Sequence, residues 1–466
     1  MRLGVPLAIG GVFAFLASRA PVSDSDLFWH LALGREIATS GLPRVDSFSW
    51  TIAGGPILVD QWLGELLIYW SYAIGSWSGI VTLRAVAVGA IAALVVASGL
   101  AERPGRPLVA VLAALPAIAL SRFAWTDRPE LLGLLCFATC VALLGAARRG
   151  SARALAATIP LLMVWANVHG SYALGLGIVV LALLARALSD PSERLRSLVV
   201  AVAAAIATLL TPAGLATWTS SGGHFLAPPR FIQEEGTPDI ATLPGAIFAV
   251  ALFAVLTTAL LAPRAEGRRT IADLALLIPV AFVSLSAQRH LVFFPIAAAP
   301  YLAARAPEVF ARVAALRPEM LWRVRRGTEP APRTVDLAGL VIALGLVLVG
   351  ATTAPREPDL SAFPNGALAA LPGGSGLLNR YDWGGFLIWY APATPVFVDG
   401  RLFPYAGALD DYRAVIGLHA DWREVIRRRG IRTILVGPVD AVAVRGVDLG
   451  WTVLARSSSF VLLEAP

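Results

Sequence analysis

The sequence predicts a mainly α-helical, polytopic membrane protein with a small C-terminal α/β domain. Of its 466 residues, 57% are apolar and only 15% are charged, whereas soluble domains contain about 45–50% and about 25%. The mean hydropathy of +0.70 agrees with this. The apolar residues also form runs of about 20, the length that crosses a bilayer as a helix. This composition excludes a disordered chain, and two cysteines exclude a disulfide scaffold.

Eleven apolar runs predict the membrane spans. They lie near residues 3–19, 79–101, 106–121, 130–147, 154–169, 171–189, 197–214, 243–262, 270–287, 291–305 and 336–354. A further segment, 62–76, is shorter, contains Glu65 and is rich in Trp and Tyr. Aromatic rings favour the membrane interface. We therefore expect 62–76 to be an amphipathic helix that lies on the membrane surface within the first outer loop.

The arginines predict the orientation. The chain contains no lysine, and arginines occur in every connection of one side, namely 102–106, 148–153, 190–196, 263–269 and 305–335. The positive-inside rule places these connections in the cytoplasm. Eleven spans then give a multi-pass inner-membrane protein with a cytoplasmic N-terminus and an extracytoplasmic C-terminal domain. Because the arginines are scattered among apolar runs, we expect the bilayer as partner and no nucleic acid.

The C-terminal part differs in pattern from the rest. From about residue 355, Pro, Gly and Asn separate short β-like runs at 385–392, 395–399, 432–436, 451–455 and 459–464, and 406–429 is typical of helix. We therefore expect two domains. The first is a transmembrane domain over 1–354 that includes a long first outer loop at 20–78, and the second is the α/β domain over 355–466.

Polar residues that could take part in catalysis or substrate binding lie mainly on the predicted outer side of the membrane. Four of the five histidines lie there, and the inner loops contain none. Ionisable groups at membrane depth are costly and often functional. We expect one polar cavity that opens outward, although arginines at span ends also extend to the interface for purely structural reasons. The residues at the outer ends of later spans are Arg122, Arg128, Asn167, His169, Glu234, Arg289 and His290.

The sharpest local motif is Asp24-Ser-Asp26-Leu-Phe-Trp-His30, directly after the first span. Two carboxylates one residue apart can share a divalent cation, or one can act as a base. On a helix, His30 lies on the same face as Asp26. Asp24 also suits the N-cap of such a helix, so the motif equally fits a capped interfacial helix without chemistry.

These residues resemble a known superfamily. A short first span, a long first outer loop with an acidic pair and many later spans resemble the GT-C superfamily of membrane glycosyltransferases. More closely, the chain is similar to a group of bacterial GT-C-like membrane proteins in the segments DSDLFWHLALGREIATSGLPRVDSFSW, VDQWLGE, RPELLGLL, WANVHGSYALGL, RYDWGGFLIW and PVFVDGR. The resemblance covers nearly the whole chain. It implies a sugar donor on a polyprenyl phosphate, transfer on the outer face and a divalent metal such as Mg²⁺ or Mn²⁺. The superfamily's acidic pair corresponds to Asp24 and Asp26, the expected metal ligands.

Sugar transfer from a lipid phosphate needs a base and a group that holds the departing phosphate. We expect Asp26 or Asp24 to be the base, with His30 beside them and inversion at the anomeric carbon. Arginine suits phosphate, so Arg122, Arg128 and Arg289 are candidates, with His169 and His290 as donors. Arg128 before Pro129 and Glu130 also fits a simple helix start. The acceptor is an envelope glycan, lipid or protein.

The sequence also fits two other classes of membrane protein. A transporter or flippase would carry charges along a path near the midplane, whereas here they gather at outer span ends. A non-catalytic envelope assembly protein could keep the same fold. The tail motif Asp399-Gly400-Arg401 is typical of a turn after a strand, with substrate contact as the alternative.

Overall fold

A computed structural model describes residues 3–226, 233–261, 267–315, 333–401 and 403–465. Backbone contacts divide the chain into two compact units. Unit 1 comprises 1–20 and 81–354, and unit 2 comprises 21–80 and 355–466. This division differs from the expected domain boundary, because the first outer loop groups with the C-terminal part. The physical reason is a set of main-chain contacts within unit 2. Trp50 donates its amide to Val396, whose own amide bonds to Phe48.

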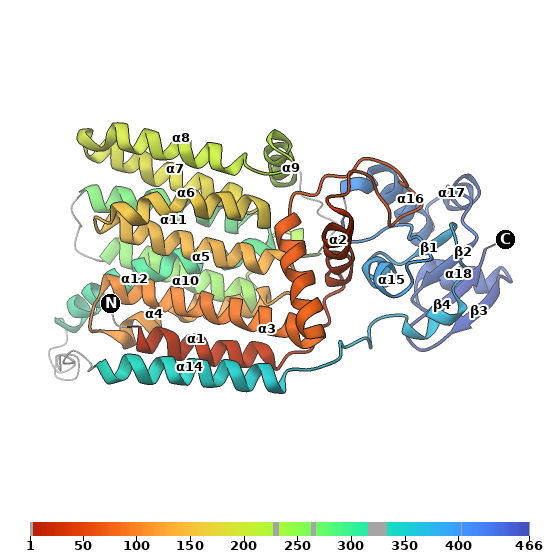
Figure 1. Ribbon diagram of the computed structural model, residues 1–466, viewed down its shortest axis with the longest axis horizontal. Helices are drawn as coiled ribbons and strands as arrows, with labels where there is room; N and C mark the ends of the chain where they lie inside the picture. Colours follow the sequence, from red (N-terminus) through yellow and green to blue (C-terminus); the bar gives the residue numbers. More distant parts are fainter. Residues whose placement is uncertain (1–2, 227–232, 262–266, 316–332, 402, 466) are drawn as a thin grey trace. The chain divides into compact units, whose positions relative to one another are not determined.

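Unit 1 is a bundle of helices that run side by side (Figure 1). Its helices are α1 (Gly4–Ser18), α4 (Pro107–Ser121), α5 (Pro129–Arg148), α6 (Ala152–Val168), α7 (Tyr172–Ser189), α8 (Arg194–Thr208), α9 (Leu215–Leu226), α10 (Leu243–Leu261), α11 (Gly267–Ser284), α12 (Phe293–Ala315), α14 (Arg333–Thr353) and the later part of α3 (Trp62–Glu102). Each of the eleven predicted spans overlaps one helix. Among the described residues, six helices are long and apolar enough to cross a membrane.

The bundle has two ends of different chemistry. We call the end formed by η1 (Arg122–Ala124), the start of α5, residues 167–172 and η4 (Gln288–Val292) the histidine end. The opposite end, with Glu102 and the last residues of α5 and α7, is the arginine end. Several arginines predicted to lie in the cytoplasm, at 264 and between 316 and 332, fall outside the described residues.

Helix α3 is broken at one residue. Ser76 has φ 52° and ψ −146°, which is non-helical, so 62–75 and the later span are separate helical segments. A methyl group at Gly79 would lie 1.9 Å from the carbonyl oxygen of Ser71, so only glycine fits this turn. The break confirms that 62–75 is a helix separate from the span. Its position on the membrane surface stays a prediction.

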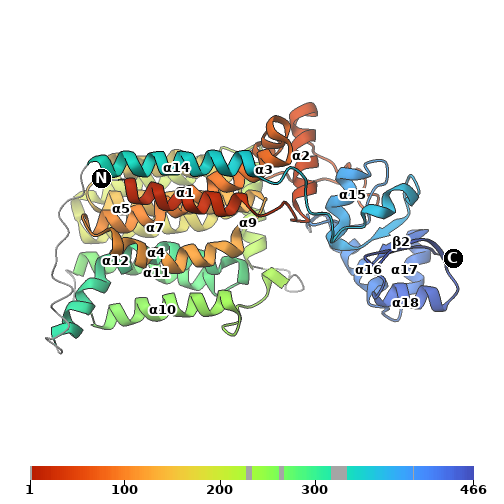
Figure 2. The same cartoon turned by 90° about the horizontal axis from the view of Figure 1, so that it is seen from below.

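Helices α1 and α14, far apart in sequence, pack closely through glycines. A methyl at Gly339 would lie 2.0 Å from the Gly4 carbonyl oxygen, and one at Gly11 would lie 2.6 Å from Ala343 Cα. Both views show the two helices side by side (Figures 1 and 2). Small residues let membrane helices approach in this way. The first and the last span are thereby joined.

Unit 2 contains a four-stranded sheet of order β1-β2-β4-β3. The strands are β1 (Leu377–Asn379), β2 (Thr433–Val436), β3 (Thr452–Arg456) and β4 (Val461–Glu464). Strands β1 and β2 are parallel, and the other pairs are antiparallel. The helices are α2 (Leu27–Ser40), the start of α3, α15 (Gly384–Tyr390), α16 (Ala406–Ile416), α17 (Trp422–Arg429) and α18 (Ala441–Asp448), with a 3₁₀ turn, η8, at Phe403–Tyr405.

Two predicted strands of the tail are wrong, and three are confirmed as β2, β3 and β4. Residues 384–390 form helix α15, because a short apolar run does not distinguish a strand from a buried helix. Gly385 lets α15 approach α2, since a methyl there would lie 2.7 Å from the Ser25 carbonyl oxygen. Residues 395–399 form only an isolated bridge, from Val396 to Ser49.

Candidate functional site

The acidic motif begins helix α2 in unit 2. Asp26 is the N-cap residue, and its side chain makes no capping bond. Asp24 Oδ1 accepts the Asp26 amide at 3.1 Å, so Asp24 closes the turn before the helix. The expected N-cap is therefore displaced by two residues, from Asp24 to Asp26. Both carboxylates are half-buried.

A glycine of the C-terminal part lies against Asp26. A methyl at Gly400 would come within 2.0 Å of Asp26 Oδ1 and 2.8 Å of Trp29 Nε1. A side chain at position 400 would therefore displace this carboxylate. Trp29 Nε1 is buried and has no hydrogen-bond partner among the described residues. A buried donor without a partner costs about 1–3 kcal/mol, and a water or a bound oxygen atom can remove that cost.

The residues on either side of Gly400 form a buried ionic network, which we call the Arg401 network (Asp46, Asp399, Arg401 and Tyr405). Asp399 Oδ1 accepts Arg401 Nε at 2.9 Å, and Oδ2 accepts Arg401 Nη2 at 2.6 Å. Arg401 Nη1 donates to Asp46 in the first outer loop. The Tyr405 hydroxyl donates to Asp399 Oδ2 at 2.5 Å. The network thus fixes both backbone neighbours of Gly400.

Electrostatics favours the charged form of this arginine. Burial alone lowers the pKa of Arg401, but the charge and hydrogen bonds of Asp399, with Tyr405 and Asp46, raise the pKa well above its usual value. Burial, followed by the Asp399 charge, raises the pKa of Tyr405 well above its usual value. Arg401 is therefore a permanent cation and Tyr405 a neutral donor.

His30 is engaged inside unit 2. Its Nδ1 lies 2.8 Å from Glu65 Oε2, with both side chains buried, and its ring lies 3.5 Å from that of Trp29 between centroids. Gly34 allows this pairing, since a methyl there would lie 2.4 Å from the Glu65 carbonyl oxygen. His30 thus joins α2 to the 62–75 segment. Its predicted catalytic role stays a prediction.

Two arginine–glutamate pairs lie at the histidine end of unit 1. Arg128 Nη1 donates to Glu234 Oε1 at 3.0 Å, and Arg289 Nη2 lies 2.8 Å from Glu235 Oε1. The glutamates are neighbours in the 3₁₀ turn η3 (Gln233–Glu235), which packs on η4. The structure therefore brings together Arg128, Glu234 and Arg289 from three separate segments. Helix α5 begins at Pro129 with Glu130 in its first turn, as the structural alternative expected.

The histidines at this end are held by serines. His169 Nδ1 accepts the Ser171 amide at 3.1 Å, so the neutral ring carries its proton on Nε2, as a donor to another group. His290 Nδ1 lies 2.9 Å from Ser286 Oγ. Both rings are partly exposed. His169 can therefore present Nε2–H as a donor. The Ser286 hydroxyl donates to the Val283 carbonyl oxygen, so His290 Nδ1 donates to Ser286 and Nε2 of the neutral His290 ring is an acceptor. A donor role for His290 and a substrate contact of either ring stay predictions.

Two other candidates have different surroundings. Asn167 is buried and donates to the carbonyl oxygens of Met163 and Leu210, which ties the end of α6 to the turn after α8. Arg122 is exposed, and its guanidinium lies 5.1 Å from the Trp125 ring centroid. Its segment η1 packs on η4. Arg122 thus stays near the Arg289 segment, whereas Asn167 makes structural contacts.

A buried ion pair of unit 1 was missed by the sequence argument. Arg84 Nη1 donates to Asp127 Oδ2 at 2.7 Å, and Arg84 Nη2 donates to the Ala20 carbonyl. Asp127 directly precedes Arg128. The pair therefore connects α3 and the end of the first span to the start of α5. A single arginine within an apolar run was the only signal for it.

The residues fit a divalent cation only in part. Asp24 and Asp26 offer carboxylate oxygens, the ligands that Mg²⁺ and Mn²⁺ prefer. Within the described part of the chain, however, no group of three His, Cys, Asp or Glu side chains is arranged to hold a metal. A cation held by the two aspartates would need water or substrate oxygens to complete its coordination.

The surroundings of Asp26 include further residues that sequence reasoning did not place at the site. Gly400 and Arg401 were expected to form a turn after a strand, Glu65 was named only as part of the 62–76 segment, and Asp46 was not among the predicted site residues. The link between Gly400 and Asp26 joins residues 374 positions apart, so no spacing rule predicts it. The only local signal was an Asp-Gly-Arg triplet after an apolar run.

Comparison with known proteins identifies the fold of this chain. No family model matches the chain, and neither does any curated protein. Among solved structures, the apo oligosaccharyltransferase of Archaeoglobus fulgidus aligns with TM-score 0.54 and 15% identity over 92% of this chain and 69% of that chain. The same enzyme tethered to an acceptor peptide gives 0.57 and 14%, over 93% and 68%.

A second solved protein aligns over nearly its full length. ArnT from Cupriavidus metallidurans, bound to undecaprenyl phosphate, aligns with TM-score 0.51 and 16% identity over 99% of this chain and 97% of that chain. These neighbours are GT-C membrane proteins. The chain therefore has the GT-C fold, a polytopic helix bundle with a small C-terminal sheet, and the resemblance seen in the sequence is confirmed as a resemblance of fold.

Proposed function

We propose that this protein is an integral membrane glycosyltransferase. It transfers a sugar from a polyprenyl-phosphate donor to an extracytoplasmic glycan, lipid or protein acceptor, with inversion at the anomeric carbon. The observation that carries the proposal is the way in which the surrounding residues hold Asp26. Two segments, 24–50 and 396–401, together place one half-buried carboxylate against a glycine, beside a buried indole donor. A base must be held in position, and this arrangement holds Asp26.

Asp26 takes the proton of the acceptor hydroxyl. The freed oxygen then attacks the anomeric carbon from the side opposite the phosphate. The bond from that carbon to the phosphate oxygen breaks, and polyprenyl phosphate leaves. A divalent cation held by Asp24 and Asp26 would neutralise charge on that phosphate.

The charges at the histidine end suit a sugar phosphodiester. Arg128 pairs with Glu234 and Arg289 pairs with Glu235, while Arg122 lies in η1, which packs on η4. A guanidinium is the group that best binds the phosphate of such a sugar donor. Arg128 or Arg289 then exchanges its glutamate for a phosphate oxygen. The convergence of these residues with Asp26 on one outward cavity stays a prediction.

The test is transfer from a polyprenyl-phosphate sugar by the full-length protein in lipid. Asp26→Asn keeps shape and removes the charge, so we expect a loss of about 10²–10⁴ in rate, with normal insertion and melting temperature. Asp448→Asn, an exposed aspartate of the same unit, is the matched control and should keep the wild-type rate.

A second variant separates the two aspartates. Asp24→Asn should mainly change the dependence of the rate on Mg²⁺ or Mn²⁺. Wild-type rates for both variants would refute the assignment of the acidic motif. A wild-type protein that moves the lipid-linked sugar across the bilayer without transferring it would instead indicate a flippase. A protein with neither activity would indicate an assembly role.

A further inference from the structure

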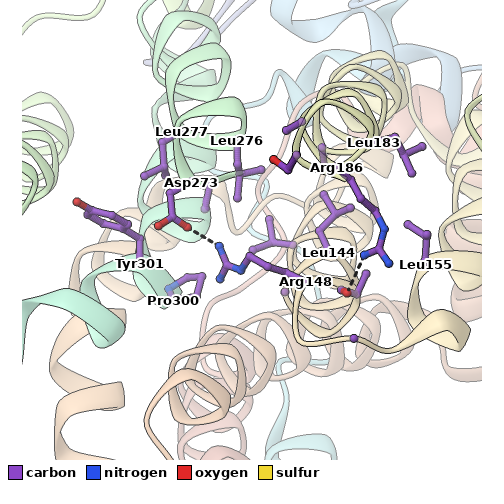
Figure 3. A pocket seen from close by; sticks show the side chains of 18 of the residues that line it. Leu144, Arg148, Leu155, Leu183, Arg186, Asp273, Leu276, Leu277, Pro300 and Tyr301 are labelled. Carbon is purple, nitrogen blue, oxygen red and sulfur yellow. Dashed lines mark hydrogen bonds and ion pairs between the residues drawn. The ribbon is translucent and has the colours of Figure 1, made fainter. Parts of the chain in front are cut away.

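Unit 1 contains a pocket at its arginine end, away from the residues discussed above. Its volume is about 380 Å³, within the range of roughly 300–1,000 Å³ that is usual for small-ligand sites. Helices α5, α7, α11 and α12 supply most of the lining (Figure 3). The apolar part of the lining is formed by leucines, among them Leu144, Leu155, Leu183, Leu276 and Leu277.

The polar part of the pocket contains both signs of charge. Arg148 Nη1 donates to Asp273 Oδ1 at 2.5 Å, and Arg186 Nε donates to Glu193 Oε2 at 3.0 Å. Figure 3 shows Arg148 and Asp273 pointing toward one another across the pocket. With Asp190, the lining has three carboxylates and two arginines. Arg305 also lies 3.9 Å from Asp273. A ligand that carries both charges can pair with the arginines and with the carboxylates.

The helices around the pocket also face lipid. Leu184 and Leu188 of α7 and Ile278 of α11 are more than half exposed. In a spanning bundle such residues contact acyl chains. The arginine-rich loops beside the pocket place it, by the positive-inside rule, at the level of the inner-leaflet headgroups. A ligand that enters from the bilayer thus meets leucines first and charged groups at the headgroup level.

We propose that this pocket binds an inner-leaflet phospholipid whose headgroup carries a phosphate and a primary amine. The phosphate pairs with Arg148 and Arg186, the ammonium with Asp273 and Glu193, and an acyl chain lies along the leucines. Because the headgroup brings one charge of each sign, its binding leaves the net charge of the pocket unchanged. The ligand is held by a lipid anchor, which a soluble amino phosphate lacks.

The experiment compares lipids bound by the full-length protein. The protein is exchanged into nanodiscs of phosphatidylcholine with a minor share of phosphatidylethanolamine or phosphatidylglycerol, and co-purified lipid is measured by native mass spectrometry. We expect phosphatidylethanolamine to be enriched about tenfold, equivalent to about 1.4 kcal/mol, over both other lipids. Soluble glycerophosphoethanolamine should not compete at equal concentration. If it does, the ligand comes from the cytosol and the lipid proposal fails.

Variants locate the effect. Glu193 lies at the partly exposed rim of the pocket, and Glu193→Gln should reduce the enrichment of phosphatidylethanolamine several-fold. Asp273→Asn should abolish this enrichment. Arg149→Gln is the control, because Arg149 pairs with Glu102 and does not line the pocket. Should Asp273→Asn not fold, the Glu193→Gln result decides. Equal binding of all three lipids by the wild type, or unchanged enrichment in Glu193→Gln, would overturn the proposal.

Discussion

Gly400 is the residue whose replacement tests the position of Asp26 without altering any charge. In Gly400→Ala the new methyl meets Asp26 Oδ1 and Trp29 Nε1, so the carboxylate must move. A displacement of about 1 Å can cost about 10² in rate. We expect kcat for sugar transfer to fall by about that factor, with little change in KM. Gly373→Ala, with open space around it, should match the wild type in the same assay. Equal rates for both variants would show that Gly400 does not position Asp26.

The raised pKa of Tyr412 predicts that the protein loses stability at high pH. Its hydroxyl accepts the Tyr381 amide at 3.0 Å, and burial raises its pKa to about 12. The unfolded chain loses this proton near pH 10, so between about pH 10 and 12 the unfolded state binds fewer protons than the folded state. Stability therefore falls as pH rises through this window, by about 2–3 kcal/mol.

Denaturant unfolding followed by tryptophan fluorescence at pH 9 and pH 11.5 measures this effect. Tyr412→Phe removes the titrating group, so its stability should depend less on pH than that of the wild type. Identical pH dependence in the two proteins would contradict the assignment.

At the scale of elements, the close contact between α1 and α14 can be tested with two glycines of the same helix, one inside the contact and one outside it. Gly339→Leu would force the α14 backbone away from Gly4, whereas Gly345, on the same helix, has nothing within 4 Å of its Cβ position. Overpacking a close contact costs about 1–3 kcal/mol. We expect a lower melting temperature in lipid for Gly339→Leu and no change for Gly345→Leu. The same shift in both variants would indicate a general effect of added bulk.

The elements show where sequence reasoning succeeds and where it fails. Each predicted span overlaps a helix, because a helix satisfies the backbone hydrogen bonds of an apolar run within a bilayer. Strands β2 to β4 were also predicted. Helix α15 was not, because its seven residues are apolar on all sides and its helical form depends on packing against α2. At the site, the residue types were predicted, but the neighbours that hold Asp26 come from distant segments and leave no local pattern.

At the scale of the whole molecule, the orientation is the main prediction left to test. Single cysteines at Ala152 and Ser458, both exposed, are introduced after Cys136 and Cys140 are replaced by alanine. A membrane-impermeant maleimide should label position 458 in intact spheroplasts and position 152 only after permeabilisation. Labelling of both from the same side would contradict the eleven-span topology.

The division into units has a consequence for how the protein is made. Residues 21–80 complete their unit only with residues 355–466, so the loop that carries Asp26 leaves the ribosome long before its packing partner. Translation of the intervening segment takes roughly 15–55 s at about 5–20 residues per second. During that time Phe28, which the finished fold packs against Phe363 and Phe386, has neither ring beside it. The surroundings of Asp26 are therefore completed only after the last predicted span and the residues that follow it have been synthesised.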